Sequence, residues 1–178
     1  ENWYMNPSVL ILGAKGDIAK EIAKVYASNG YDLILSGRKI SELEGFARDL
    51  QRLNVVVELK ELDITNLGTF AEFISKLKNF PKGIIIGTGF NPSNYAACNN
   101  QDKFMEVINV NYIGPIAFIN SIKNKMKQGF IIGISSVAGE RGRKKNYVYG
   151  SAKSAFSTYM SGLRQELYPD SFSLITNA

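Results

Sequence analysis

The sequence has no histidine and a single cysteine, Cys98, among its 178 residues. Zinc and similar transition-metal sites are built largely from histidine and cysteine ligands, so a site of that kind is excluded. One cysteine also cannot form an internal disulfide. This fits a reducing compartment, and we expect a cytoplasmic protein.

Long hydrophobic runs are also missing. No apolar stretch approaches the roughly 20 residues that span a bilayer, and no basic segment followed by an apolar one marks a secretory signal. We therefore expect no membrane span. A length of 178 residues, with 45% hydrophobic and 21% charged residues, suits one soluble globular domain, which we place over residues 1–178.

The charge balance is mildly basic, with a net charge of +5. Such a balance fits a nucleic acid, an anionic cofactor or an anionic substrate. The one dense basic cluster comprises Arg141, Arg143, Lys144 and Lys145. Aromatic residues do not interleave with it, so we expect no nucleic-acid partner.

Strand-like and helix-like segments alternate along the chain. Short apolar runs predict strands buried on both faces, and apolar residues at helical spacing predict the helices between them. The expected strands cover residues 8–12, 31–36, 55–62, 83–88 and 130–135, with a sixth beginning at 172–175. The expected helices cover residues 17–27, 41–53, 65–78, 103–127 and 147–168, and residues 91–101 are predicted to be a loop.

Several residues are typical of helix ends. Gly30 is expected to end the first helix, because glycine favours the left-handed conformation just past a helix C-terminus. Pro169 is expected to end the last helix. Ser41 with Glu44 fits a capping box, and Thr65 or Asn66 can cap the third helix. Gly114-Pro115 is expected to bend the long helix.

Strands that alternate with helices of 10 to 20 residues imply right-handed crossovers and a parallel sheet covered on both faces. The predicted fold class is therefore α/β, a doubly wound (Rossmann) sheet of the kind that binds nucleotides.

The turn between the first strand and the first helix reads Gly13-Ala14-Lys15-Gly16-Asp17-Ile18-Ala19. Glycine lets the backbone turn tightly and approach a pyrophosphate, which the free N–H groups at the helix N-terminus can then bind. Ala19 is small enough for the helix to pack closely on the sheet. The spacing lacks the last glycine of the common dinucleotide fingerprint, and an ordinary β-to-α turn is the alternative.

The end of the second strand indicates which dinucleotide is bound. NAD sites place an acid there for the ribose hydroxyls, whereas NADP sites favour a basic residue. This chain has Ser36-Gly37-Arg38-Lys39, with no carboxylate beside Arg38 to repel a 2′-phosphate. Arg38 can bind such a phosphate with two hydrogen bonds, and Lys15 adds charge, so we expect NADP(H) to be preferred to NAD(H).

Three residues near the C-terminal end are suited to proton transfer. Tyr149 and Lys153 lie four residues apart and share one face of a helix. An ammonium beside a phenol stabilises the phenolate, which suits the phenol to general acid–base catalysis. Ser136, at the end of the preceding strand, can hydrogen-bond the same substrate oxygen. A packed tyrosine beside an exposed lysine is the simpler alternative.

In these motifs the chain resembles the short-chain dehydrogenase/reductase family. The resemblance covers residues 8–176 and rests on the glycine turn together with segments in family order: Leu62-Asp63-Ile64, Gly87-Thr88-Gly89, Asn109-Val110-Asn111, Ser135-Ser136 and Tyr149 to Lys153. It implies an oxidoreductase that moves a hydride to or from a carbonyl or alcohol.

The resemblance also implies a role for each matching residue. Tyr149 would donate the proton, Lys153 would assist it and hold the nicotinamide ribose, Ser136 would polarise the carbonyl, and Asn111 would support a proton-relay water. Asp63 would contact the adenine, although local capping explains Asp63 and Asn111 equally well. The implied cofactor-binding residues are Gly13, Lys15, Gly16, Asp17, Ile18, Arg38, Asp63, Gly87, Gly89, Tyr149 and Lys153.

The chain departs from the family's common pattern at Asp17 and Ala19, where glycines are usual. The turn is similar to that of the extended branch of sugar-nucleotide epimerases and dehydratases. The segment Glu140-Arg141-Gly142-Arg143 is similar to that of reductases acting on polyprenyl-phosphate-linked keto-pentoses. That similarity implies a phosphate-bearing sugar as substrate, bound near Arg141 and Arg143.

Family members continue past the sixth strand with a substrate-covering lid and a seventh strand, and we expect both to be missing from these 178 residues. Two alternatives to a reductase therefore stay open, an extended-branch enzyme and a non-enzymatic dinucleotide-binding regulator. The resemblance also implies a homo-oligomer, a dimer or tetramer, formed through the long helix from Lys103 and the helix that carries Tyr149.

Overall fold

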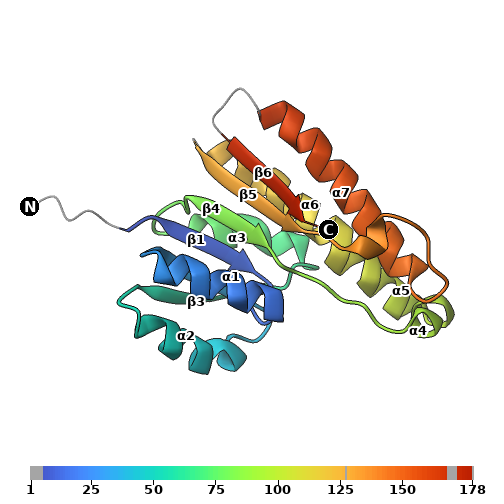
Figure 1. Cartoon of the computed structure of the whole chain (residues 1–178), viewed down its shortest axis with the longest axis horizontal. Coiled ribbons are helices and arrows are strands. Elements are labelled where there is room, and N and C mark those ends of the chain that lie inside the picture. The colour runs from blue at the N-terminus through green and yellow to red at the C-terminus, as the bar shows by residue number, and fades with distance from the viewer. Residues whose placement is uncertain (1–5, 127, 168–171, 178) are drawn as a thin grey trace, which may run out of the picture.

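The computed structural model describes residues 6–126, 128–167 and 172–177. Six parallel strands form one sheet in the order β3-β2-β1-β4-β5-β6 (Figure 1). The strands are β1 (Ser8–Leu12), β2 (Asp32–Gly37), β3 (Val57–Glu61), β4 (Gly83–Ile86), β5 (Gly129–Ile134) and β6 (Phe172–Asn177). Because the chain crosses from β3 to β4 past β1, the strand order reverses between β1 and β4. The predicted doubly wound α/β fold is confirmed.

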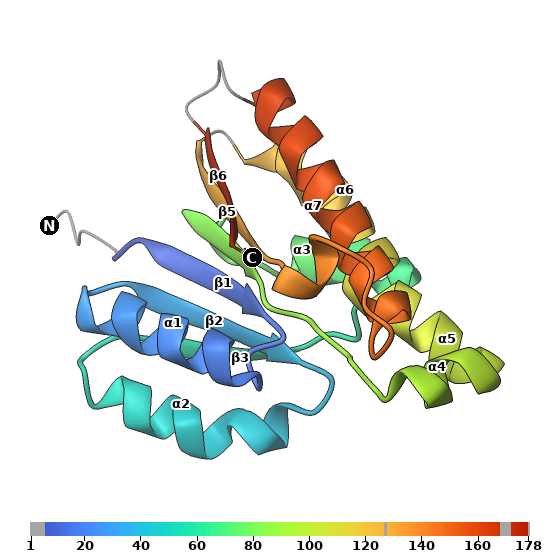
Figure 2. The same ribbon diagram turned by 45° about the vertical axis from the view of Figure 1, so that its right-hand side comes forward.

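Within the described ranges, seven α-helices connect or follow these strands. They are α1 (Asp17–Ser28), α2 (Glu44–Gln51), α3 (Phe70–Ser75), α4 (Asn94–Asn99), α5 (Gln101–Ile108), α6 (Gly114–Ile122) and α7 (Tyr147–Leu167). Figure 2 shows α1 and α2 on one face of the sheet and α3, α6 and α7 on the other, while α4 and α5 lie beyond the ends of the strands. None of the helices in the described ranges is long and apolar enough to cross a membrane.

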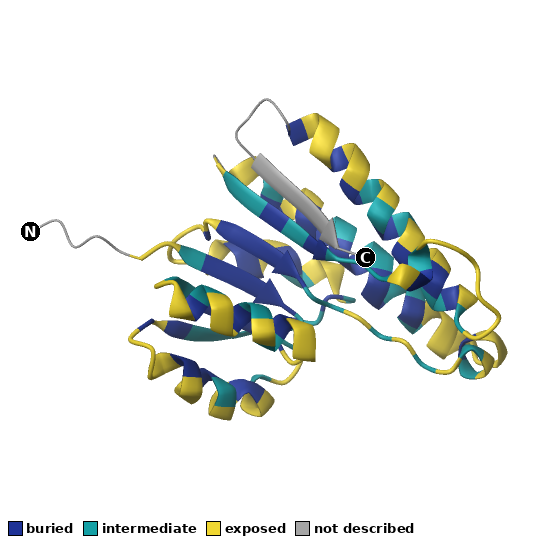
Figure 3. Ribbon diagram, viewed as in Figure 1, coloured by how far each residue is buried: buried dark blue, intermediate teal, exposed yellow. Residues whose placement is uncertain are grey.

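Side-chain alternation along the strands divides the core into two layers. Successive residues of a strand point to opposite faces, so Val9 and Ile11 pack under α1 and α2, while Leu10 and Leu12 pack under α3, α6 and α7. All four are buried, which explains why β1 is a continuous apolar run (Figure 3).

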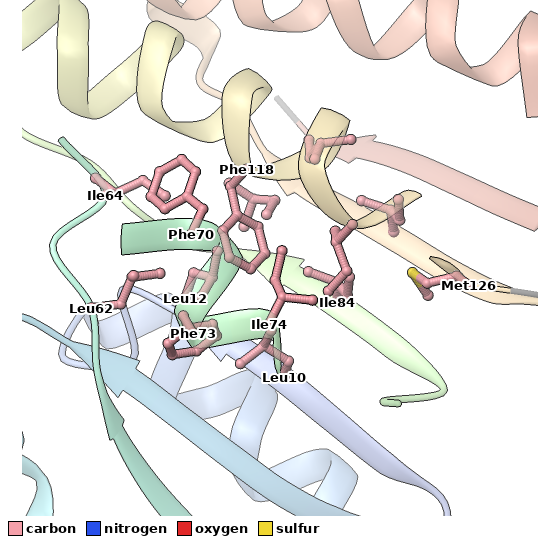
Figure 4. Packing of buried hydrophobic residues seen from close by; sticks show 14 of the residues in the cluster. Leu10, Leu12, Leu62, Ile64, Phe70, Phe73, Ile74, Ile84, Phe118 and Met126 are labelled. Atoms are coloured by element: carbon pink, nitrogen blue, oxygen red, sulfur yellow. The ribbon is translucent and has the colours of Figure 1, made fainter. Parts of the chain in front are cut away.

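Aromatic rings fill the second layer (Figure 4). The ring of Phe118 in α6 meets those of Phe70 and Phe73 in α3 edge-to-face, with centroids 5.3 and 5.9 Å apart. Burial of each large side chain stabilises the fold by about 1.5–3 kcal/mol. The layer fixes α6 against the sheet, and α6 continues directly from the helical turns that border the functional site.

The predicted ends of two helices need correction. A 3₁₀ turn occupies Ile40–Leu43 ahead of α2, so Ser41 lies inside helical structure and does not form a capping box with Glu44. Another 3₁₀ turn, Leu67–Thr69, precedes α3, and Asn66 begins it without a side-chain cap. Gly30 does follow α1 with a φ of +77°, as its position predicted. Tyr168 and Pro169 lie outside the described residues.

The prediction of a loop over residues 91–101 is wrong, because α4 lies within it. The Ser93 hydroxyl begins this helix by accepting a hydrogen bond from the Ala96 N–H at 3.2 Å. Asn100 caps α5 in the same way, accepting from the Lys103 N–H at 2.9 Å. The asparagines that suggested a loop therefore include one that begins a helix.

The predicted long helix is divided. A π-helical turn, Asn109–Ile113, joins α5 to α6, and a 3₁₀ turn, Lys123–Lys125, ends the segment. Gly114 serves close packing, since a Cβ there would lie 2.2 Å from the carbonyl oxygen of Ile64. The chain after β3 therefore passes directly against this turn.

Candidate functional site

A groove of about 670 Å³ lies at the carboxyl ends of the strands, where the strand order reverses. Ligands of open α/β sheets bind at this position. Seven of the predicted cofactor-binding residues line it: Gly13, Lys15, Gly16, Arg38, Asp63, Gly87 and Gly89. Asp17 and Ile18 begin α1 next to the groove but do not line it.

The glycine turn forms one wall of the groove. Gly13 has a φ of +71°, and a Cβ there would lie 2.8 Å from backbone atoms of Gly87 and Thr88. The Ala14 N–H ties the turn to β2 through the carbonyl of Ser36 at 3.0 Å. The turn and the end of β4 therefore approach each other closely, with the N-terminus of α1 able to bind an anion.

Lys15 and Arg38, the two basic residues predicted to bind a 2′-phosphate, are each paired with a carboxylate. The Lys15 ammonium lies 2.5 Å from the Glu42 carboxylate, and the Arg38 guanidinium lies 3.7 Å from that of Glu106 in α5. The hydrogen bond and charge of Lys15 hold the pKa of Glu42 below its usual range. The expectation that no carboxylate lies beside Arg38 is therefore wrong.

Asp63 caps the turn that follows β3 and also lines the groove. Its carboxylate accepts hydrogen bonds from the backbone N–H and the hydroxyl of Thr65, at 2.9 and 2.7 Å. Asp63 therefore caps the local turn, and because it lines the groove it can also contact a ligand.

Neither Lys153 nor Tyr149 of α7 lines the groove, but the Lys153 ammonium contacts a residue that does. The Lys153 side chain is only 3% exposed, and its ammonium donates hydrogen bonds to the carbonyls of Ile134, at 3.0 Å, and Thr88, at 3.4 Å. Thr88 lines the groove. Burial lowers the pKa of Lys153 to about 8, because an ammonium is poorly solvated there.

Tyr149 lies beside Lys153 on α7. The Lys153 ammonium is 5.9 Å from the centroid of the Tyr149 ring, and the ring packs against Ala97, Val107 and Val148. The structure therefore brings together the phenol and the ammonium that the four-residue spacing placed on one helix face.

Ser136 lies two residues after the end of β5 and precedes a 3₁₀ turn, Val137–Gly139. Its hydroxyl oxygen accepts a hydrogen bond from the Ala138 N–H at 3.2 Å, so its proton can be donated to another oxygen. Gly150 allows this turn to pack on α7, since a Cβ there would lie 2.4 Å from the Ala138 carbonyl oxygen.

We expect Gly150→Ala to destabilise the fold by about 1–3 kcal/mol, because the added methyl group overlaps the Ala138 carbonyl. Gly45→Ala in α2 is the matched control, as a Cβ there meets no atom within 4 Å. It should stabilise the fold by about 0.5–1 kcal/mol through the higher helix propensity of alanine. Urea unfolding of both variants measures the difference, and equal effects would contradict the close packing.

Asn111 is fully buried in the π-helical turn. Its amide donates to the carbonyls of Phe90 and Val107, at 2.7 and 2.8 Å, and accepts from the Phe90 N–H at 3.2 Å. Both amide protons are thus used on the backbone. The side chain positions the segment after β4, and its predicted support of a water stays a prediction.

Arg141 lies away from this site. It lines a different cavity together with Tyr147, Ser151 and Ser154 of α7. At 100° per residue, those three positions face another side of the helix from Tyr149 and Lys153. Arg143 is exposed in the same loop.

Sequence reasoning missed two residues that line the groove, Glu42 and Thr88, and one that lies beside it, Glu106. Glu42 and Glu106 pair with the predicted cations, and no local pattern links Glu106 to Arg38. Thr88 was noted only as part of a glycine segment, yet its buried hydroxyl has no hydrogen-bond partner among the described residues. The sequence signal for Thr88 is a polar residue between two glycines, Gly87 and Gly89, just after a strand.

Known proteins similar to this chain indicate its family. The model of the short chain dehydrogenase family matches residues 7–176. The chain belongs to this family. An uncharacterized oxidoreductase of Staphylococcus saprophyticus is 30% identical over 164 residues, covering 89% of the chain and 66% of that protein. The chain thus spans about two thirds of the length of this curated relative.

Solved structures show the same fold at lower identity. The apo form of LigD from Sphingobium sp. strain SYK-6 matches with a TM-score of 0.90 and 22% identity, covering 97% of this chain and 77% of that one. A short-chain dehydrogenase from Sphingobium yanoikuyae in complex with NADPH matches with a TM-score of 0.86 and 24% identity, covering 96% and 70%.

Proposed function

We propose that residues 1–178 form the nucleotide-binding domain of an NADPH-dependent oxidoreductase, which moves a hydride to or from a carbonyl or alcohol. The observation that carries the proposal is the position of Lys153. Its buried ammonium bonds the carbonyl of Thr88 in the groove and also lies beside Tyr149. The expected cofactor groove and the expected proton donor therefore meet at one residue.

The groove residues fit a nicotinamide dinucleotide. The approach of Gly13 to Gly87 leaves no room for a side chain, as a turn over a pyrophosphate requires. The Thr88 hydroxyl, which has no hydrogen-bond partner among the residues that the structure describes, offers a further polar group on a residue that contacts Lys153. When bound, the nicotinamide supplies or accepts the hydride, while the pyrophosphate would lie on the glycine turn and the N-terminus of α1.

The chain's own residues perform the proton transfer. Tyr149 donates a proton to the carbonyl oxygen as the hydride arrives, and Lys153 stabilises the resulting phenolate by its charge. Ser136 donates its hydroxyl proton to the same oxygen and orients it. Asn111 holds the Phe90 backbone in place along the groove.

The preference for NADP(H) rests on Arg38 and Lys15 at the adenosine end. We expect Arg38→Ala to weaken NADPH about tenfold, the lower end of a charge-assisted contact, because the guanidinium is largely exposed. NADH, which lacks the phosphate, should change less than twofold. Arg48→Ala is the matched control, since Arg48 pairs with Glu44 outside the groove. Calorimetric titration showing equal losses for both nucleotides would reject the role of Arg38.

The substrate is proposed only as a carbonyl or alcohol. A phosphate-bearing sugar rests on the charge of Arg141 and Arg143 alone, and Arg141 faces a different cavity from Tyr149. The similarity to keto-pentose reductases therefore stays a prediction. A screen of the full-length protein for NADPH oxidation with neutral and phosphorylated carbonyl compounds tests it.

We also propose a homo-oligomer formed through α5, α6 and α7. An open cavity of about 710 Å³ runs along Tyr112 and the side of α7 that carries Ser151, Thr158 and Gly162. Phe104 and Met105 of α5 are exposed as well. Light scattering at micromolar concentration should show a dimer or tetramer. A monomer at that concentration would contradict this proposal.

A further inference from the structure

We propose that the carboxylates of Glu106 and Glu42 determine how strongly the groove prefers NADP(H) to NAD(H). They compete with the 2′-phosphate of NADP(H) for Arg38 and Lys15. The inference rests on the proposed function and assigns two specificity-determining residues to the nucleotide site. It starts from the two ion pairs at the adenosine end, Lys15 with Glu42 and Arg38 with Glu106.

Glu106 is held at the groove by its own helix. Its carboxylate lies 2.9 Å from the ammonium of Lys103, one turn earlier in α5. The same ammonium lies 5.0 Å from the centroid of the Phe90 ring, and Phe90 lines the groove. Contacts with Lys103 and Arg38 therefore fix the carboxylate beside the groove, and its side chain is 27% exposed.

The Arg38–Glu106 pair joins opposite sides of the groove. Arg38 follows β2, on the side of the sheet reversal that holds β3, β2 and β1. Glu106 comes from α5, which follows β4. Figure 2 shows α5 beyond the strand ends, away from α2. A nucleotide phosphate that binds Arg38 must share this guanidinium with Glu106 or replace it.

Glu42 acts in the same way through its ion pair with Lys15. It lines the groove itself. The hydrogen bond and charge of Lys15, followed by the charges of Lys39 and Arg38, lower the pKa of Glu42, so it is ionised at neutral pH. A 2′-phosphate brings a charge of about −1.5 to −2 and is repelled by both carboxylates. A 2′-hydroxyl brings no charge. The two carboxylates therefore reduce the preference for NADP(H) that Arg38 and Lys15 create.

The test measures the ratio of the NADH and NADPH dissociation constants for the full-length protein and its variants by calorimetry. Glu106→Gln keeps the shape of the side chain and removes its charge. It should raise the ratio about three- to fivefold, the range that exposed ion pairs allow. Glu42→Gln is an independent variant with the same expected direction. Glu21→Gln is the matched control, since Glu21 pairs with Lys24 on α1 outside the groove, and it should change the ratio less than about twofold.

The outcomes separate the two proposals. A parent protein that binds neither nucleotide overturns the proposed function and this inference together. A parent protein that binds NADPH, with variants whose ratio stays within twofold of the parent or falls, overturns the inference alone. A rise in both Gln variants but not in Glu21→Gln supports it.

Discussion

Tyr149→Phe should lower kcat by about 10²–10⁴, the usual loss when a positioned general acid is removed. The substitution deletes one oxygen and keeps the ring, so the packing of Tyr149 on Ala97, Val107 and Val148 should persist. NADPH affinity should stay within about threefold of the parent, because Lys153 and the glycine turn are unchanged. Turnover and NADPH affinity are measured separately on the full-length protein.

Tyr147→Phe is the matched control for this variant. Tyr147 lies two residues earlier in α7, and its hydroxyl lies 3.1 Å from the sulfur of Cys98 and not at the groove. Its loss should leave kcat within about twofold. If Tyr149→Phe keeps more than about a tenth of the parental kcat while chemistry limits the rate, Tyr149 is not the acid.

Lys153→Met should reduce both NADPH affinity and kcat, in contrast to Tyr149→Phe. The variant removes the charge that stabilises the phenolate, so we expect kcat to fall by about 10²–10⁴. It also removes the group that bonds the Thr88 and Ile134 carbonyls, which disturbs the end of the groove. Lys144→Met, in the exposed loop before α7, is the control. Unchanged NADPH affinity in Lys153→Met would contradict a role in cofactor binding.

Stability against pH provides an independent readout for Lys153. Burial lowers its pKa from 10.5 to about 8 in the folded protein. Between these values the unfolded chain holds a proton that the folded protein releases, so the free energy of unfolding rises with pH. The full effect is about 3 kcal/mol. The free energy of unfolding of the parent should therefore rise from pH 8 to 10 relative to that of Lys153→Met. If the two free energies change with pH in parallel, burial does not lower the pKa of Lys153.

The strands and the groove were predictable because they depend on local patterns. Runs such as Val9 to Leu12 are apolar at every position because both faces of the sheet are covered, and this marks each strand directly. Parallel strands end at one edge of the sheet, so Gly13, Arg38, Asp63 and Gly87 had to meet there.

The features that the sequence did not predict depend on contacts between distant segments. Glu106 reaches Arg38 only because the chain after β4 brings α5 to the end of β2. Helix α4 was missed because its first residues, Asn94 and Tyr95, follow Pro92-Ser93 and resemble a loop until the Ser93 cap is seen. The position of Arg141 depends on how the loop before α7 folds back, which composition does not encode.

A crystal structure of the full-length protein with NADPH tests the central claim most directly. The account predicts the 2′-phosphate on Arg38, the pyrophosphate on the Gly13–Gly16 turn, and the nicotinamide ribose within hydrogen-bond distance of Lys153 and Tyr149. Density for NADPH outside this groove, or reversed in it with the nicotinamide at Arg38, would contradict the proposed oxidoreductase site.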